Sequence, residues 1–173
     1  MLNRIKRTLR HRWLSTFAAQ PAISVALSER LHQLVTASET HHTGEIRIFI
    51  ETGLPLSYLL REQSMSELAR QRALAMFGRL RVWDTENNNG VLIYLLLAER
   101  HVELMADRGL NTLVSPQEWS SLISKMSSAF QRSDYETGLI QALSEVSALL
   151  TIHFPLEAGE RNINELPDAP VLG

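Results

Sequence analysis

An uninterrupted apolar run at residues 91–98, with the sequence VLIYLLLA, constrains the fold of this chain more than any other segment. Strands that face water on one side alternate polar and apolar residues, whereas a run without alternation is typical of a strand buried on both faces. The run is far shorter than the roughly 20 residues that a membrane-spanning helix requires. It therefore predicts a central strand in a sheet that helices cover on both sides.

Two further segments predict the neighbours of this strand. Glu99-Arg100 marks a turn and residues 101–106 return as a second strand, so the short connection predicts an antiparallel hairpin. Upstream, residues 45–51 alternate polar and apolar side chains as a strand does. A long helix predicted at about residues 57–77 separates the two strands, which makes them a parallel βαβ unit. The sequence thus predicts an α/β fold with a mixed sheet covered by helices.

Helix start signals complete this domain, which we expect at residues 21–154. Ser28 is a candidate N-cap for a helix that runs to about His42. Ser115 precedes a proline and Asp134 precedes a second apolar stripe, so both predict the starts of closing helices. His41 and His42 would point to different faces of a helix end, where we expect solvent rather than a shared metal ion.

The two ends of the chain differ from this domain in composition. Residues 1–20 predict a basic amphipathic helix, because apolar residues recur at steps of three and four between arginines and a lysine. Such a helix suits a membrane surface or an acidic or membrane-protein partner, and it can equally pack on its own domain with a solvated basic face. Residues 155–173 are acidic and poor in apolar side chains, which predicts a flexible, extended tail.

Composition excludes several classes of function. The 173 residues include no cysteine, which removes disulfides, cysteine-ligated zinc and thiol nucleophiles. The formal net charge of −2 gives no general attraction to nucleic acid. The sequence also lacks a Gly-x-Ser-x-Gly elbow, a phosphate-binding loop and a dinucleotide fingerprint. We therefore expect no nucleotide, flavin, haem or zinc, and no nucleic-acid partner.

The predicted hairpin brings oxygen-rich residues together at one corner. Its topology places the start of the first strand beside the end of the second, so loop 84–89 should lie near Asp107 and Arg108. Carboxylate and amide oxygens suit Ca²⁺ or Mg²⁺, which predicts a metal site at Asp84, Asn88 and Asp107. The guanidinium group of Arg108 would suit a phosphate or carboxylate.

Two interpretations of this corner remain open. A bound divalent ion could activate water for phosphomonoester hydrolysis without a covalent nucleophile, with Asp84, Asp107 and Arg108 as the candidate catalytic residues. Alternatively, Asp84 and the asparagines only cap and turn the backbone before a buried strand, and Asp107-Arg108-Gly109 forms a turn with a structural ion pair.

Four short motifs, in their order along the chain, resemble the TPM domain family, named for a thylakoid lumen phosphatase, a photosystem II repair protein and a nematode receptor modulator. They are Gly44-Glu45-Ile46, Asn89-Gly90-Val91-Leu92-Ile93, Asp107-Arg108-Gly109-Leu110 and Asp134-Tyr135-Glu136-Thr137-Gly138-Leu139, and the resemblance covers residues 27–154. It implies a three-layer α/β/α sandwich and, as in some members, weak acid phosphatase activity and calcium binding.

The chain also departs from this family in two ways. Many bacterial members carry a signal peptide and a C-terminal membrane helix, and we expect neither here, which implies a soluble cytoplasmic branch that is peripheral to the membrane if residues 1–20 bind there. Asn88 stands where other members often have Asp. A calcium site should therefore carry one negative charge less and bind its ion more weakly.

Two hypotheses of different classes follow. The first is a TPM-type domain with a divalent-cation or anion site and at most weak metal-assisted phosphatase activity. The second is a non-enzymatic adaptor in membrane-protein assembly or envelope stress that docks through residues 1–20.

Overall fold

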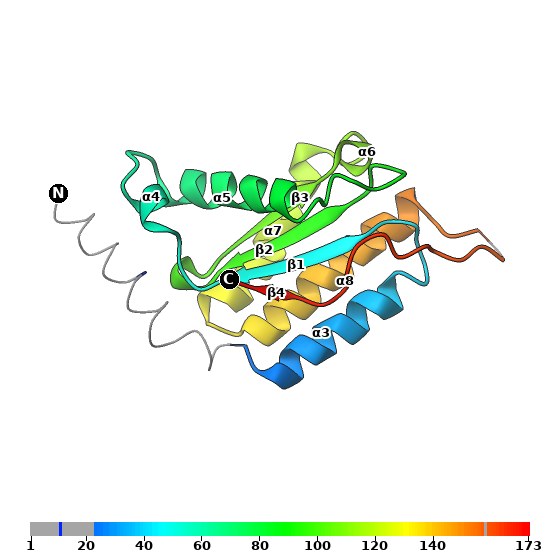
Figure 1. Cartoon of the computed structure of the whole chain (residues 1–173), viewed down its shortest axis with the longest axis horizontal. Helices are drawn as coiled ribbons and strands as arrows, with labels where there is room; N and C mark the ends of the chain where they lie inside the picture. Colours follow the sequence, from blue (N-terminus) through cyan, green and yellow to red (C-terminus); the bar gives the residue numbers. More distant parts are fainter. Residues whose placement is uncertain (1–10, 12–22, 158) are drawn as a thin grey trace.

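A four-stranded mixed sheet forms the centre of the molecule (Figure 1). The computed structural model describes residue 11, residues 23–157 and residues 159–173. The strands are β1 (Ile46–Glu51), β2 (Val91–Leu96), β3 (His101–Ala106) and β4 (Val171–Leu172), in the order β3-β2-β1-β4. β1 runs parallel to β2 and β4, whereas β2 and β3 are antiparallel. Both predicted strand pairings, the parallel βαβ unit and the hairpin, are confirmed.

Helices cover both faces of this sheet. They are α3 (Val25–Ser38), α4 (Leu56–Leu59), α5 (Met65–Arg79), the short 3-10 helix η1 (Leu97–Glu99), α6 (Arg108–Asn111), α7 (Pro116–Gln131) and α8 (Tyr135–His153). Figure 1 shows α5 on one side of the sheet and α3 and α8 on the other, and α7 packs against α8 and β3. The expected three-layer α/β/α sandwich is confirmed.

The two central strands are buried on both faces, as the apolar run predicts. Every residue of β1 and of β2 is buried. Ile46, Ile48 and Ile50 pack in the cluster beneath α3 and α8, while Phe49 packs with Tyr94 in the cluster beneath α5. Each large apolar side chain buried in this way contributes about 1.5–3 kcal/mol to folding.

Three predicted helix boundaries are wrong, and capping side chains explain two of them. The N-cap of α3 is Ser24, four residues before Ser28, because its side chain accepts a hydrogen bond from the backbone of Leu27. α3 ends at Ser38 and not near His42. The single helix predicted at about residues 57–77 is two helices, since Ser64 and Glu67 form a capping box that starts α5 anew. By contrast, the predicted N-caps Ser115 and Asp134 are confirmed.

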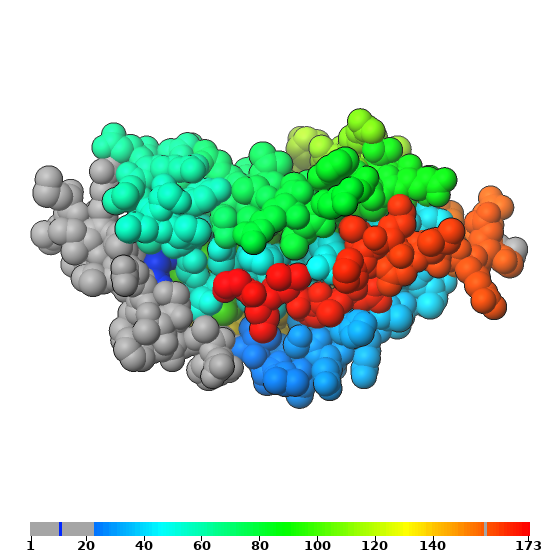
Figure 2. Space-filling view, in the orientation of Figure 1, coloured from blue at the N-terminus to red at the C-terminus, as the bar shows by residue number. Residues whose placement is uncertain are grey.

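The segment after Pro155 is extended, but it differs from the expected flexible tail because it is docked on the domain. It lies across the surface between α3 and the loop before β2 (Figure 2). Leu166 is buried in the core beneath α5, and its backbone N–H donates to Glu45 Oε2 at 3.1 Å. The segment then pairs with β1 as β4. Backbone hydrogen bonds and one anchoring side chain hold a stretch that is otherwise poor in apolar residues.

A group of buried polar residues surrounds the start of β1. The Glu39 side chain accepts a hydrogen bond from the backbone of Ile46 at 3.1 Å. Burial and the negative charge of Glu45 raise the pKa of Glu39 to about 8. His42 is fully buried rather than solvated, between the Ser38 hydroxyl at 2.8 Å and the Gly44 carbonyl. Burial lowers the pKa of His42 to about 4, so this imidazole is neutral near pH 7.

The raised pKa of Glu39 predicts a loss of stability in alkali. The folded chain holds the Glu39 proton more tightly than the unfolded chain, so this contribution is complete below the ordinary pKa of 4.5 and is lost as the pH rises through about 8. We expect Glu39→Gln, which keeps an acceptor for Ile46, to unfold at higher urea concentration than wild type at about pH 9 but not at about pH 4. Glu29→Gln, on the exposed face of α3, is the control. Equal midpoints for Glu39→Gln and wild type at the higher pH would contradict the prediction.

Close backbone packing at the start of β2 predicts opposite effects for two glycines. A Cβ atom at Gly90 would lie 2.0 Å from the carbonyl oxygen of Val82, whereas a Cβ at Gly78 in α5 would meet nothing within 4 Å. We expect Gly90→Ala to destabilise the fold by about 1–3 kcal/mol. Gly78→Ala should stabilise it by about 0.5–1 kcal/mol, because alanine restricts the unfolded chain. Thermal and urea unfolding of both variants measure the difference, and a tolerated Gly90→Ala would refute the close contact.

Candidate functional site

The loop before β2 and the end of β3 meet at the corner that the hairpin topology predicts. The side-chain oxygen Oδ1 of Asn88 accepts a hydrogen bond from Arg108 Nε at 2.9 Å. The backbone N–H of Gly109 donates to the carbonyl oxygen of Asn88, also at 2.9 Å. One side-chain contact and one backbone contact therefore fix the loop against the residues that follow β3.

Gly109 allows this close approach. A Cβ atom at that position would lie 2.5 Å from the carbonyl oxygen of Asn88 and 2.7 Å from that of Asn87. Asn88 itself has a φ of 52°, a left-handed conformation that asparagine tolerates better than most residues. Together the two residue types explain why Asn88 can point its side chain at Arg108.

Asp84 takes no part in this contact. Its carboxylate pairs with Arg81 Nη2 at 2.6 Å within the loop, and the side chain is 44% exposed. Asn89 also turns away, because its Nδ2 donates to Thr43 Oγ1 and its backbone to Thr85 Oγ1 in the interior. Of the predicted corner residues, the structure brings together Asn88, Asp107 and Arg108.

Asp107 is the N-cap of α6. Its Oδ1 accepts from the backbone N–H of Arg108 at 2.7 Å. Its Oδ2 is buried and has no hydrogen-bond partner. A buried carboxylate oxygen without a partner is uncommon in folded proteins, because it keeps the cost of desolvation without the gain of a hydrogen bond.

Arg108 is exposed, and its guanidinium group is oriented by one contact only. Asn88 holds Nε, and the two terminal nitrogens have no hydrogen-bond partner within the described part of the chain. This leaves the four N–H groups of Nη1 and Nη2 on a positively charged plane. Such a fork matches the oxygens of a phosphate or carboxylate.

The same contacts disfavour a divalent cation in the observed arrangement. The amide oxygen of Asn88 is occupied by a guanidinium group, whose positive charge would repel a metal ion bound there. Asp84 is engaged by Arg81. Residues 11, 23–157 and 159–173 contain no group of three or more His, Cys, Asp or Glu side chains that could hold a metal ion.

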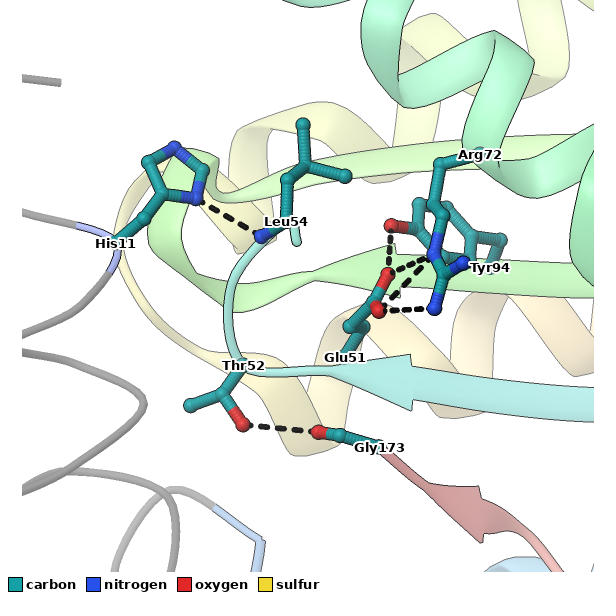
Figure 3. A network of polar contacts seen from close by, with 7 residues as sticks. All are labelled: His11, Glu51, Thr52, Leu54, Arg72, Tyr94 and Gly173. Carbon is teal, nitrogen blue, oxygen red and sulfur yellow. Dashed lines mark hydrogen bonds and ion pairs between the residues drawn. The ribbon is translucent and has the colours of Figure 1, made fainter. Parts of the chain in front are cut away.

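A second polar cluster lies at the carboxyl ends of β1 and β2, and sequence analysis missed it (Figure 3). Arg72 Nε donates to both carboxylate oxygens of Glu51 at 3.0 Å, and Arg72 Nη2 donates to Glu51 Oε1 at 2.6 Å. The hydroxyl of Tyr94 donates to Glu51 Oε2 at 2.7 Å. One signal was present in the sequence, since Arg72 interrupts the apolar stripe of the predicted helix.

This second cluster is structural rather than reactive. Glu51 is 4% exposed, and each of its oxygens already accepts from Arg72 or Tyr94. Burial and the charge of Glu51 raise the pKa of the Tyr94 phenol, which therefore stays protonated and donates. A buried carboxylate whose two oxygens both accept hydrogen bonds fixes the neighbouring side chains but offers no free oxygen to a substrate.

Other parts of the chain cover this same end of the sheet. His11 is buried, and its Nδ1 accepts from the backbone N–H of Leu54 at 3.0 Å (Figure 3). Its Nε2 contacts Glu99 Oε1 at 2.8 Å. Thr52 donates to the Gly173 carbonyl. The rest of the basic helix predicted at residues 1–20 lies outside the described residues, so its binding to a membrane or to an acidic partner stays a prediction.

Among the described residues, no helix is long and apolar enough to cross a bilayer.

Comparisons with known proteins give the family of the chain. The BA42 protein of the psychrophilic bacterium Bizionia argentinensis has a similar fold, with a TM-score of 0.72, 23% identity, and coverage of 87% of this chain and 95% of that one. The N-terminal domain of a P. gingivalis protein gives a TM-score of 0.58 at 20% identity, covering 80% and 84%.

The search of curated proteins finds no match. The family model of the TPM domain matches residues 20–149. This match spans most of the chain and agrees with the motifs in the loop before β2 and at the end of β3. The chain therefore belongs to the TPM domain family.

Proposed function

We propose that this TPM domain binds a small anion, such as a phosphomonoester, at the corner formed by Asn88, Asp107 and Arg108. The observation that carries the proposal is the exposed guanidinium group of Arg108, held through Nε by Asn88 at 2.9 Å. Orienting the fork in advance lowers the entropy lost when an anion binds. The family resemblance to phosphatases supports a phosphate oxyanion over other anions.

Any hydrolysis at this corner is slow. Arg108 supplies charge neutralisation and orientation, which stabilise a phosphoryl group in the ground state and in the transition state alike. Asp107 Oδ1 is engaged by the helix backbone. Binding of phosphomonoesters is therefore the main activity that we propose, with weak phosphatase activity as its upper limit.

Loss of the guanidinium group should weaken anion binding. We expect Arg108→Gln to reduce the affinity for phenyl phosphate by at least about tenfold, because a charge-assisted hydrogen bond contributes about 1.5–3 kcal/mol. The affinity of Arg108→Lys should lie between those of wild type and Arg108→Gln, since an ammonium group keeps the charge but loses the planar fork. Isothermal titration calorimetry at low salt measures the three affinities.

The matched control is Arg132→Gln. Arg132 is exposed beyond the end of α7, near the η1 end of β3 and away from Asp107. This substitution removes the same charge far from the proposed site. The variant should therefore bind phenyl phosphate as tightly as wild type does, apart from a small loss of long-range electrostatic attraction. Equal binding by Arg108→Gln and wild type, or no saturable binding by wild type, refutes the proposal.

A divalent cation is the second candidate ligand of this corner, and one observation favours it. Asp107 Oδ2 is buried without a hydrogen-bond partner, and a Ca²⁺ ion would satisfy it. This requires Arg108 to leave Asn88, which would free an amide oxygen as a further ligand. Ca²⁺ and the guanidinium group therefore compete for the same site.

Asp107→Asn separates these two ligands. Asparagine is also a good N-cap, so α6 should remain formed. If Ca²⁺ binds, the variant loses affinity by at least about tenfold, because a charged ligand becomes neutral. If the anion binds instead, the variant keeps or gains affinity for phenyl phosphate, since a nearby negative charge is removed. Calorimetry with CaCl₂ and with phenyl phosphate gives opposite results for the two candidates.

A further inference from the structure

The outer edge of β3 carries unpaired backbone groups. β3 is the last strand of the sheet on its side. Asp107 bonds to Gly90 across the hairpin, and hydrogen-bonded pairs alternate along an antiparallel ladder. With Leu92 opposite Met105 and Ile93 opposite Leu104, this alternation turns the backbone N–H and C=O groups of residues 102, 104 and 106 away from β2.

No strand of the described chain pairs with this edge. Val102 is only 3% exposed, whereas Leu104 and Ala106 border a groove. The sequence of β3, HVELMA, also contains no lysine or proline, which are the residues that commonly protect an exposed edge strand from pairing with another chain. The edge is therefore open to a further strand at residues 104–106.

A groove of about 450 Å³ runs along the same edge. Leu104, Met105 and Ala106 of β3 line it, together with Arg70 of α5 and Trp119 of α7. α5 and α7 pack on opposite faces of the sheet. A groove lined from both faces by consecutive residues of β3, and not by β2, must pass around the outer edge of the strand.

Charge favours an acidic occupant. Arg70 is the one charged residue among those that line this groove. Its side chain is 64% exposed, and its contact with Glu103 is a long one, at 3.4 Å. Glu103 already has a second partner in His101, at 2.7 Å. Arg70 is thus able to turn to a carboxylate brought by a ligand.

Trp119 provides an aromatic wall with an unsatisfied donor. The indole nitrogen Nε1 is buried and has no hydrogen-bond partner. Tryptophan is common in interfaces because its ring supplies contact area and its N–H seeks an acceptor. The carbonyl groups of an extended peptide are such acceptors.

We propose that the outer edge of β3 binds an extended peptide segment of another protein, which adds to the sheet as a fifth strand and places an Asp or Glu side chain against Arg70. The backbone groups of residues 104 and 106 supply the pairing, as in other cases of strand addition. The groove beside Leu104 and Trp119 accepts the alternate apolar side chains. This surface is separate from the anion site, and either proposal can fail without the other.

Selection from a phage-displayed library of random decapeptides on the immobilised full chain tests this proposal. We expect enriched peptides to alternate apolar residues and to carry an acidic residue at a fixed position. In the complex with a synthetic enriched peptide, amide exchange should slow at Leu104 and Ala106 but not change at Met105, whose N–H faces β2. Failure to enrich such peptides, or protection elsewhere only, overturns the proposal.

Variants locate the binding further. Ala106→Pro removes one outward N–H without touching the ladder to β2, and Arg70→Glu reverses the charge of the groove. Each substitution should reduce the affinity for the enriched peptide by at least about tenfold. Arg79→Glu makes the same charge change at an exposed position of α5, and Arg108→Gln alters the anion site, so both should bind as wild type does.

Two further outcomes decide against the proposal. If thermal unfolding shows that Ala106→Pro does not fold, the test rests on Arg70→Glu alone. Wild-type affinity of Arg70→Glu for the enriched peptide then overturns the proposal that the edge binds an acidic peptide. If sedimentation shows that the chain dimerises and that Ala106→Pro abolishes the dimer, the edge binds a second copy rather than another protein.

Discussion

Burial of β2 on both faces is the constraint on which the rest of this structure depends. All six of its residues are buried, so helices must cover each side of the sheet, and the polar residues of the neighbouring strands need partners in the interior. Glu51 finds Arg72 and Tyr94 at one end of the sheet, and Glu45 binds the backbone of the docked tail at the other. These two polar contacts therefore lie at opposite ends of β1.

The ion pair and the carboxylate–backbone contact at the strand ends stabilise by holding parts together rather than by their own energy. A buried ion pair gains little over an apolar pair of the same shape, but leaving one partner alone is costly. The contact of Arg72 with Glu51 therefore fixes α5 over β1, and that of Glu45 with Leu166 fixes the tail. The acidic composition of the tail conceals this role, because its attachment uses backbone N–H groups.

Local signals in the sequence predicted the central strand, the hairpin, the N-caps Ser115 and Asp134, and the meeting of the loop before β2 with Arg108. Each depends on residues that are close in sequence or joined by one tight turn. The pairing of Glu51 with Arg72, which are 21 residues apart, depends on how α5 packs and has no local signal beyond a charge in an apolar stripe. The predicted metal site includes Asp84 because this residue shares a loop with Asn88. In the structure its carboxylate instead forms an ion pair with Arg81, three residues earlier in the chain.

The position of the candidate site follows from the direction of the strands. Ligands of α/β proteins bind beyond the carboxyl ends of strands, and in β1 and β2 the chain itself fills that region with Arg72 and His11. β3 runs the opposite way, so its carboxyl end opens at the other end of the sheet, where Asp107 and Arg108 follow it. The candidate site therefore also lies at the carboxyl end of a strand, but that strand is β3, the one antiparallel strand of the sheet. Because that strand also forms the edge, an anion at its end and a peptide along its side would lie next to each other.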